Sequence, residues 1–133
     1  MADKIQFDLV SPERLLLSEE VDMVTLPGSE GEFGVLPGHA PVLSTLKSGV
    51  VEVKGLSEAL SRIFVRGGFA EVNNDKVTVL AEEAVPLSDV DANELDQRIR
   101  NTGEDLAAAK SDDDRARIAA ELEHLKQLRA AIN

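Results

Sequence analysis

The sequence predicts an all-β N-terminal domain, a sandwich or barrel, followed by a C-terminal antiparallel α-helical hairpin. Up to about Leu80 the apolar residues favour a period of two, and Gly, Pro, Asn and Ser recur between them at short intervals. After Pro86 the apolar residues instead follow one another at three- and four-residue steps. We therefore predict two domains, a β-sandwich over residues 1–86 and a helical hairpin over residues 87–133.

The strands of the first domain are predicted from apolar residues two positions apart. These residues are Ile5, Phe7 and Leu9; Val21 and Met23; Val51 and Val53; Val77 and Val79. Successive side chains of a strand point to opposite faces, so this alternation is typical of strands with one buried face. Turn dipeptides separate the segments: Ser11-Pro12, Pro27-Gly28, Pro37-Gly38, Ser48-Gly49, Gly67-Gly68 and Asn73-Asn74. Many short strands separated in this way predict a sandwich or barrel.

Two helices are predicted after Pro86. Ser88 or Asp89 is expected to cap the first, whose apolar face comprises Ala92, Leu95, Ile99, Thr102, Leu106 and Ala109. Ser111 is expected to start the second, because the three aspartates that follow it suit the positive end of the helix dipole. The apolar face of the second helix comprises Ile118, Leu122, Leu125 and Ile132, with Leu128 close by.

The short polar turn between these helices predicts an antiparallel hairpin in which the two apolar faces meet. Gly103 costs the first helix about 1 kcal/mol relative to Ala. Because the faces are narrow and bury little, we expect the hairpin to be weakly attached and mobile. The alternative is that both helices cover one sheet of the sandwich.

The composition excludes several classes of function. The chain has 133 residues, no cysteine and a formal net charge of −11. Without cysteine there are no disulfides, iron–sulfur clusters, thiolate zinc sites or cysteine nucleophiles. The negative charge opposes binding to nucleic acid and to anionic lipid, and neither Trp nor Tyr is present to stack on bases. No apolar run approaches the roughly 20 residues that span a bilayer, so we expect no direct membrane insertion.

The N-terminal residues lead straight into the first predicted strand, with neither a secretory apolar region nor an Arg-rich transit helix. We expect a bacterial cytoplasmic product. The common catalytic and metal-binding motifs are also absent from the sequence, including the phosphate-binding loop, the His-Glu-x-x-His pair, the nucleophile elbow and the EF-hand loop. His39 has no second histidine near it in sequence, which favours packing or a partner contact over catalysis. His124 is expected on the solvated side of the second helix.

Glu30 and Glu32 flank Gly31 in a segment rich in turn residues. Paired carboxylates can serve glycoside hydrolysis or metal binding. With further glycines at positions 28 and 34, however, the backbone is expected to turn tightly and to project the acids outward, which suits a docking surface better than a pocket. We therefore expect no catalytic residue, no metal and no cofactor.

A longer stretch around these acids resembles a known family. The segment from Gly28 to Pro41, Gly-Ser-Glu-Gly-Glu-Phe-Gly-Val-Leu-Pro-Gly-His-Ala-Pro, resembles the hallmark stretch of the epsilon subunits of bacterial F-type ATP synthases. Residues 7–14, 67–72 and 75–81 are similar to other parts of the sandwich in that family. The resemblance covers the first domain throughout and, by length and architecture, the hairpin.

The resemblance implies a non-catalytic rotor subunit in the central stalk of a proton-translocating F-type ATP synthase. Such a subunit couples the gamma subunit to the c-ring, as a peripheral protein at the cytoplasmic face of the bacterial inner membrane. The positions that the resemblance carries over as contacts to the c-ring and gamma are Glu30, Gly31, Glu32 and His39, with Ser11 and Ser44 on the gamma side. We expect most of the binding energy to come from an apolar face of the sandwich, which the sequence does not locate.

In many members of this family the hairpin reaches the alpha/beta catalytic head and blocks hydrolysis. In some it binds ATP through an Ile/Leu-Asp-x-x-Arg-Ala motif at the start of its first helix. Here Asp91 is retained, but Glu94 replaces the arginine and Leu95 the alanine. Since a carboxylate repels phosphate, we expect ATP binding to be weakened or lost. Whether the hairpin inhibits hydrolysis stays open, because it is acidic overall. A local basic stripe is supplied by Arg115, Arg117, Lys126 and Arg129.

Two other classes of function remain as alternatives. The composition alone equally permits a stand-alone β-sandwich adaptor that binds some other protein. An enzyme that uses Glu30, Glu32 and His39 would lose turnover when these residues are replaced by alanine.

Overall fold

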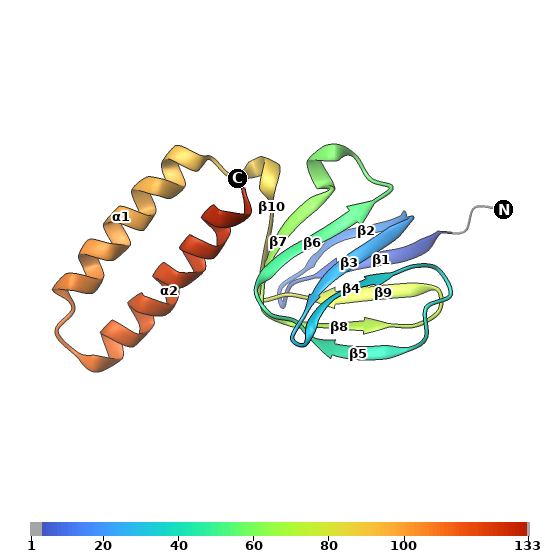
Figure 1. Ribbon diagram of the computed structural model, residues 1–133, viewed down its shortest axis with the longest axis horizontal. Helices are drawn as coiled ribbons and strands as arrows, with labels where there is room; N and C mark the ends of the chain where they lie inside the picture. Colours follow the sequence, from blue (N-terminus) through green and yellow to red (C-terminus); the bar gives the residue numbers. More distant parts are fainter. Residues whose placement is uncertain (1–3, 133) are drawn as a thin grey trace. The chain divides into compact units, whose positions relative to one another are not determined.

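The computed structural model describes residues 4–132 of the chain (Figure 1). The chain divides into two compact units between Ser88 and Asp89. Within the described residues, the first unit is built from ten strands in two sheets and the second from two α-helices. The predicted fold class, an all-β sandwich followed by an antiparallel helical hairpin, is confirmed.

The strands of the first unit are short. They are β1 (Ile5–Val10), β2 (Leu15–Val21), β3 (Met23–Gly28), β4 (Gly31–Val35), β5 (Val42–Thr45), β6 (Gly49–Lys54), β7 (Arg62–Arg66), β8 (Phe69–Val72), β9 (Lys76–Leu80) and β10 (Glu83–Pro86). Two 3-10 turns accompany them, η1 (Glu58–Leu60) and η2 (Leu87–Asp89).

Each sheet has five strands. Their orders are β2-β1-β9-β8-β5 in the first sheet and β10-β7-β6-β3-β4 in the second. Strands β1 and β9 are parallel, whereas the other neighbours are antiparallel.

Between β1 and β2 the register shifts by one residue. Leu9 pairs with Leu17 and Val10 with Leu15, so β2 contains one extra residue, Leu16. Such a β-bulge lets two successive side chains point to the same face. Leu16 and Leu17 both pack against the core, while Leu15 is exposed on the other side.

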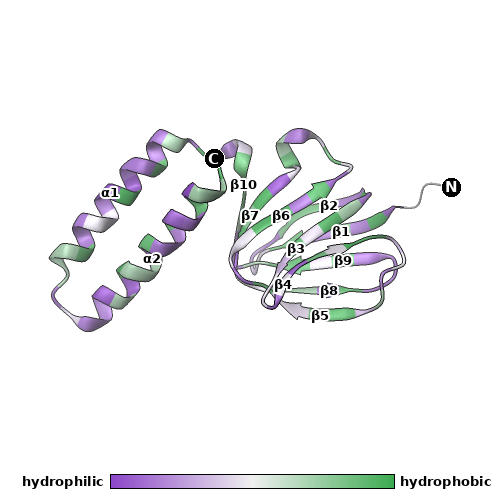
Figure 2. Ribbon diagram, viewed as in Figure 1, coloured by the Kyte–Doolittle hydropathy of each residue, from purple (hydrophilic) through white to green (hydrophobic). Residues whose placement is uncertain are grey.

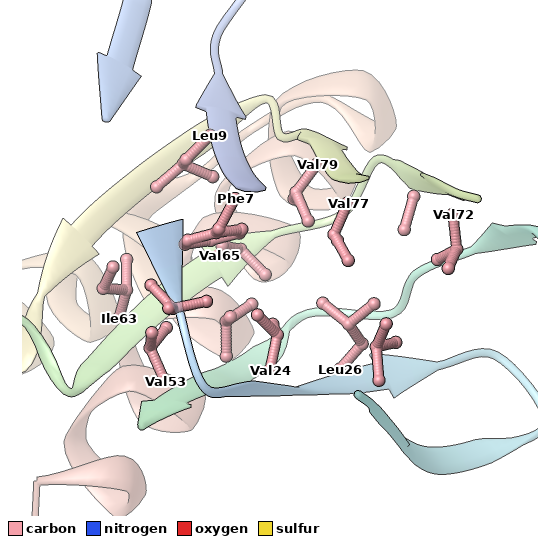
Figure 3. Close-up of a cluster of buried hydrophobic side chains, with 14 of the residues drawn as sticks. Phe7, Leu9, Val24, Leu26, Val53, Ile63, Val65, Val72, Val77 and Val79 are labelled. Atoms are coloured by element: carbon pink, nitrogen blue, oxygen red, sulfur yellow. The ribbon is translucent and has the colours of Figure 1, made fainter. Parts of the chain in front are cut away.

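The core fills the space between the two sheets (Figure 3). Phe7, Leu9, Val77 and Val79 come from the first sheet, and Val24, Leu26, Val53, Ile63 and Val65 come from the second. The buried positions follow the predicted alternation, as in β1, where Ile5, Phe7 and Leu9 are buried and the residues between them are not. Since each fully buried side chain of this kind contributes about 1.5–3 kcal/mol, the sandwich has a substantial core of its own.

The second unit comprises α1 (Ala92–Ala108) and α2 (Asp112–Ala131). The prediction of the first cap is wrong, because residues 87–89 form a 3-10 turn and the helix begins later. The Asp91 carboxylate caps α1 by accepting hydrogen bonds from the amides of Asn93 and Glu94, at 2.9 and 3.1 Å. Ser111 caps α2 as predicted, its hydroxyl accepting from the Asp114 amide at 3.1 Å.

In the hairpin, the side chains of the two predicted apolar faces are buried or half-buried. Leu95, Leu125 and Leu128 are buried, and the other residues of both faces are half-buried. The prediction of a solvated His124 is wrong: its side chain is half-buried, because it lies one turn before Leu128 and so borders the apolar face. Within residues 4–132, neither helix combines the length and the apolar character needed to cross a lipid bilayer.

Candidate partner-binding surfaces

The acidic segment singled out in the sequence is the tight hairpin between β3 and β4. Gly28 pairs with Gly31, which leaves Ser29 and Glu30 as the turn. Gly31 has a φ of 133°, a backbone conformation that residues other than Gly rarely adopt. A Cβ atom on Gly28 would lie 2.7 Å from the carbonyl oxygen of Gly31, so Gly is required there as well. The tight backbone leaves both Glu30 and Glu32 exposed.

Backbone contacts join this hairpin to the edge strand of the other sheet. Gly28 forms a bridge with Leu46, and the Ser29 amide donates to the Thr45 carbonyl at 2.9 Å. The Lys47 amide donates to the Pro27 carbonyl at 3.0 Å. The β3–β4 turn is therefore held beside β5, although the two belong to different sheets.

A surface pocket of about 350 Å³ lies at this junction. It is lined by Gly28, Glu30, Gly31, Glu32, Phe33, His39, Val42 and Ser44. We call it the Glu30 pocket. Five of the six positions carried over from the family resemblance line it, so residues that are up to 14 positions apart in sequence form one surface. The acids are exposed, as expected, but they border a pocket instead of standing on a plain projecting tip.

The polar groups of the Glu30 pocket are mostly hydrogen-bond acceptors. His39 Nδ1 lies 2.6 Å from the carbonyl oxygen of Ala40; since a carbonyl only accepts, Nδ1 donates to it. The Ser44 hydroxyl donates to the Thr45 carbonyl at 3.1 Å, which leaves its lone pairs to accept. With the two carboxylates, this pocket suits a polar or cationic group of a partner. No cluster of three or more potential metal ligands occurs within residues 4–132.

Ser11, the sixth carried-over position, lies outside the Glu30 pocket. It closes the β1–β2 turn, where its amide donates to the Arg14 carbonyl at 2.9 Å and its hydroxyl donates to the same oxygen at 3.3 Å. Ser11 therefore stabilises a turn, and it follows Val10 directly.

Val10 belongs to a row of apolar side chains that sequence reasoning missed. It pairs with Leu15 on one side and Leu80 on the other, and Leu80 pairs with Phe69. Their neighbours along the strands, such as Leu9, Val79 and Ala70, face the core, so this row lies on the outer face of the first sheet. Leu15 is 57% and Phe69 45% exposed, and the other two are half-buried. We call these four residues the apolar row.

A polar network centred on Asp8 occupies the same outer face. Asp8 Oδ1 accepts hydrogen bonds from Gln6 Nε2 at 2.9 Å and from the Ser18 hydroxyl at 2.7 Å, and Lys76 Nζ lies 3.1 Å from Oδ2. These hydrogen bonds, first that of Gln6 and then that of Ser18, together with the Lys76 ammonium hold the pKa of Asp8 below its usual value, against the opposing effect of burial. The outer face thus combines an apolar row with a hydrogen-bonded, ion-paired carboxylate.

The start of α1 differs from the nucleotide motif of the family resemblance at Glu94 and Leu95. The Asp91 carboxylate is engaged by two amides of the helix start. Glu94 is exposed and presents a carboxylate at the position where the motif has an arginine, and Leu95 is only 3% exposed. The basic stripe expected on α2 is largely neutralised as well, because three of its arginines lie within ion-pair distance of aspartates: Arg115–Asp112, Arg117–Asp114 and Arg129–Asp96.

Comparison with known proteins decides the family. The sequence profile of the ATP synthase delta/epsilon chain beta-sandwich domain matches residues 4–87, which comprise nearly all of the first unit. The chain belongs to the ATP synthase delta/epsilon chain family. The ATP synthase epsilon chain of Parvibaculum lavamentivorans is 55% identical over 132 residues, covering 99% of this chain and 100% of the relative. That of Paramagnetospirillum magneticum is 50% identical over 116 residues, covering 87% of both.

Solved structures of ATP synthases contain chains with the same fold. A chain of the Euglena gracilis mitochondrial ATP synthase, in its OSCP/F1/c-ring structure, superposes with a TM-score of 0.80 at 29% identity, over 98% of this chain and 82% of that one. A chain of the central stalk and c-ring structure from Tetrahymena thermophila shows the same fold, with a TM-score of 0.66 at 12% identity over 98% of both chains. The predicted family is confirmed, and with it the prediction of a non-catalytic central-stalk subunit of ATP synthase.

Proposed function

We propose that this chain couples the gamma subunit to the c-ring in the rotor of a bacterial F-type ATP synthase, as a peripheral subunit at the cytoplasmic face of the inner membrane. The observation that supports this best is the convergence of Glu30, Gly31, Glu32, His39 and Ser44 on one pocket. The apolar row lies on a different part of the sandwich, on the outer face of the first sheet. Two separate surfaces suit a protein that connects two partners.

The Glu30 pocket is the surface that we assign to the c-ring. Ser44, which the resemblance gives as a gamma-side position, lines this pocket and is included in the assignment. The exposed carboxylates and acceptor groups of the pocket suit polar or basic loops of a partner. Exposed charge pairs contribute only about 0–1 kcal/mol each, so the pocket is expected to set orientation more than affinity. Rigid backbone contacts to β5 favour this function, because they hold the acidic turn in one position.

The apolar row is the surface that we assign to gamma. Exposed aromatic and aliphatic side chains that become buried supply most of the affinity in many interfaces. Leu15 and Phe69 are the most exposed members of the row. Ser11, a gamma-side candidate, follows Val10 at one end of the row, which supports this assignment.

Site-directed crosslinking tests both assignments in one assembled complex. The chain contains no cysteine, so a cysteine placed at Glu32, Leu15 or Glu58 carries a photoreactive crosslinker at a single position. We expect position 32 to give products with the c subunit and position 15 to give products with gamma. Glu58, exposed on η1, is the matched control and is expected to give neither. Crosslinks from positions 15 and 32 to the same subunit would contradict the two-surface assignment, and an absence of both would contradict the coupling function.

A further inference from the structure

Few apolar side chains hold the two helices of the hairpin together. Of the residues on α1 and α2, Leu95, Leu125 and Leu128 are buried, whereas Ile99, Leu106 and the other apolar residues are at most half-buried. Figure 2 shows both helices dominated by hydrophilic residues, with hydrophobic patches between them. Charged contacts therefore contribute more to holding the hairpin closed than they contribute to the stability of the sandwich core.

Two ion pairs cross from one helix to the other. Arg129 Nε donates to Asp96 Oδ1 at 2.8 Å, and these side chains are only 30% and 39% exposed. Arg98 Nη2 lies 3.8 Å from Glu121 Oε1, a longer and more exposed pair. Partial removal from water strengthens the attraction within the first pair.

A third arginine fixes the turn between the helices. Arg115 Nη1 donates to the Ala109 carbonyl at 3.0 Å, and its Nη2 donates to Asp112 Oδ1 at 2.6 Å. The guanidinium thereby ties the C-terminal end of α1 to the first turn of α2. Charged contacts thus occur at the turn, near the middle and near the open end of the hairpin.

The order of the charges selects one register. On α1 a negative charge at Asp96 is followed by a positive charge at Arg98, and the residues facing them on α2 have the opposite signs. If α2 slid by four residues, about one helical turn, Leu125 would replace Arg129 opposite Asp96. Arg117 would then replace Glu121 opposite Arg98, so one attraction would be lost and the other would become a repulsion.

We propose that the Asp96–Arg129 and Arg98–Glu121 pairs form an electrostatic clasp that fixes the register of the hairpin and holds it closed. Salt weakens the clasp, because the screening length falls from about 10 Å at 0.1 M to about 3 Å at 1 M ionic strength. The closed hairpin is therefore expected to respond to ionic strength and to competing charges. Opening it uncovers the half-buried faces around Ile99 and Leu106.

Distance measurements on the full chain test this. Nitroxide labels on cysteines introduced at Asn93 and Ala130, both exposed, report the separation of the open ends by pulsed electron paramagnetic resonance. At low salt we expect one narrow, short distance. Asp96→Arg and Arg129→Asp are each expected to lower the ratio of closed to open hairpin by about 5- to 10-fold, because each replaces an attraction by a repulsion. The double variant Asp96→Arg/Arg129→Asp is expected to restore the short distance.

Glu123→Arg is the matched control, since Glu123 is exposed on α2 and lies outside both pairs. It is expected to leave the distance unchanged. Circular dichroism checks that each variant keeps its helices. The unsubstituted hairpin gives a second test, in which 1 M salt is expected to broaden and lengthen the distance. The proposal is contradicted if the single variants and 1 M salt leave the distance unchanged. It is also contradicted if the double variant stays as open as the single variants.

Discussion

At the scale of single residues, the polar groups of this chain act mainly through hydrogen bonds that fix local geometry. Asp8 accepts from two side chains on the face of a sheet, and Asp91 accepts from two amides at a helix start. Both carboxylates were visible in the sequence, but their roles depend on neighbours that only the fold supplies. Ser18 reaches Asp8 because β2 pairs with β1 in one particular register.

Asp8→Asn is expected to destabilise the sandwich in a pH-dependent way. At pH 7 we expect a loss of about 1 kcal/mol in the free energy of unfolding, because the charged acceptor of two hydrogen bonds is removed. The pKa of Asp8 is lowered by folding, so its contribution is present above the unfolded value near 4 and is lost as the pH falls through the folded value. Urea unfolding at several pH values measures this. A difference between the two proteins that stays constant down to pH 2.5 would contradict the assignment.

Gly103→Ala is expected to stabilise α1 by about 0.5–1 kcal/mol, because Gly is the costlier residue in a helix interior. A Cβ atom at this position meets nothing within 4 Å. Amide hydrogen exchange along α1 measures the gain. Gly68→Ala is the opposing control: because its φ is 112° and an added Cβ would collide with the Leu80 carbonyl oxygen, it is expected to destabilise the sandwich. Faster exchange in Gly103→Ala would refute the first expectation.

The chain is expected to bind ATP weakly or not at all at the start of α1, since Glu94 presents a carboxylate where the motif of the family resemblance has an arginine. Isothermal titration calorimetry with ATP is expected to give no saturable heat at millimolar concentrations. Glu94→Arg removes the repulsion and is the informative comparison. A saturable signal from the unsubstituted chain would show that another group holds the nucleotide.

At the scale of elements, the sequence pattern predicts the strands and helices, but it does not predict which of them lie side by side in the fold. The alternation of Ile5, Phe7 and Leu9 predicts a strand with one buried face, and Ser111 with its three aspartates predicts a helix start. The apolar row depends on the strand order, because Leu15, Val10, Leu80 and Phe69 come from four strands that are adjacent only in the folded sheet. The Glu30 pocket likewise requires β5 of one sheet to lie beside the β3–β4 turn of the other.

Leu15→Ser is expected to weaken binding of gamma by about 10-fold, which corresponds to the loss of one large side chain from an apolar contact. Leu15→Met keeps an apolar side chain of similar volume and is expected to bind as the unsubstituted protein does. Since Leu15 is exposed, neither change should unfold the sandwich. Surface plasmon resonance with purified gamma measures both affinities. Equal affinity for the Ser and Met variants would remove the apolar row from the interface.

At the scale of the whole molecule, the chain consists of two compact units with different kinds of stabilisation. The sandwich has a continuous apolar core between its sheets, whereas the hairpin relies on three buried leucines and on charged contacts. Both proposed partner surfaces lie on the sandwich. The assembly function is therefore expected to reside in residues 1–88.

Removal of residues 89–133 is expected to leave assembly and coupled ATP synthesis largely intact, because the Glu30 pocket and the apolar row remain. In membrane vesicles that contain the truncated chain, the subunit content measures assembly and the amount of ATP formed measures coupled synthesis. Loss of gamma from the assembled complex would contradict the expectation. The rate of ATP hydrolysis in the same vesicles separates coupling from inhibition: an increase would assign an inhibitory function to the hairpin.

The cap formed by Asp91 has a consequence for the interpretation of related sequences. Any chain that begins a helix at this point benefits from an acceptor side chain at the cap, whether or not a nucleotide ever binds there. The aspartate of the motif can thus be retained because it caps the helix, even where no nucleotide binds. Helix capping alone therefore accounts for an aspartate at this position, which is not by itself a mark of ATP sensing.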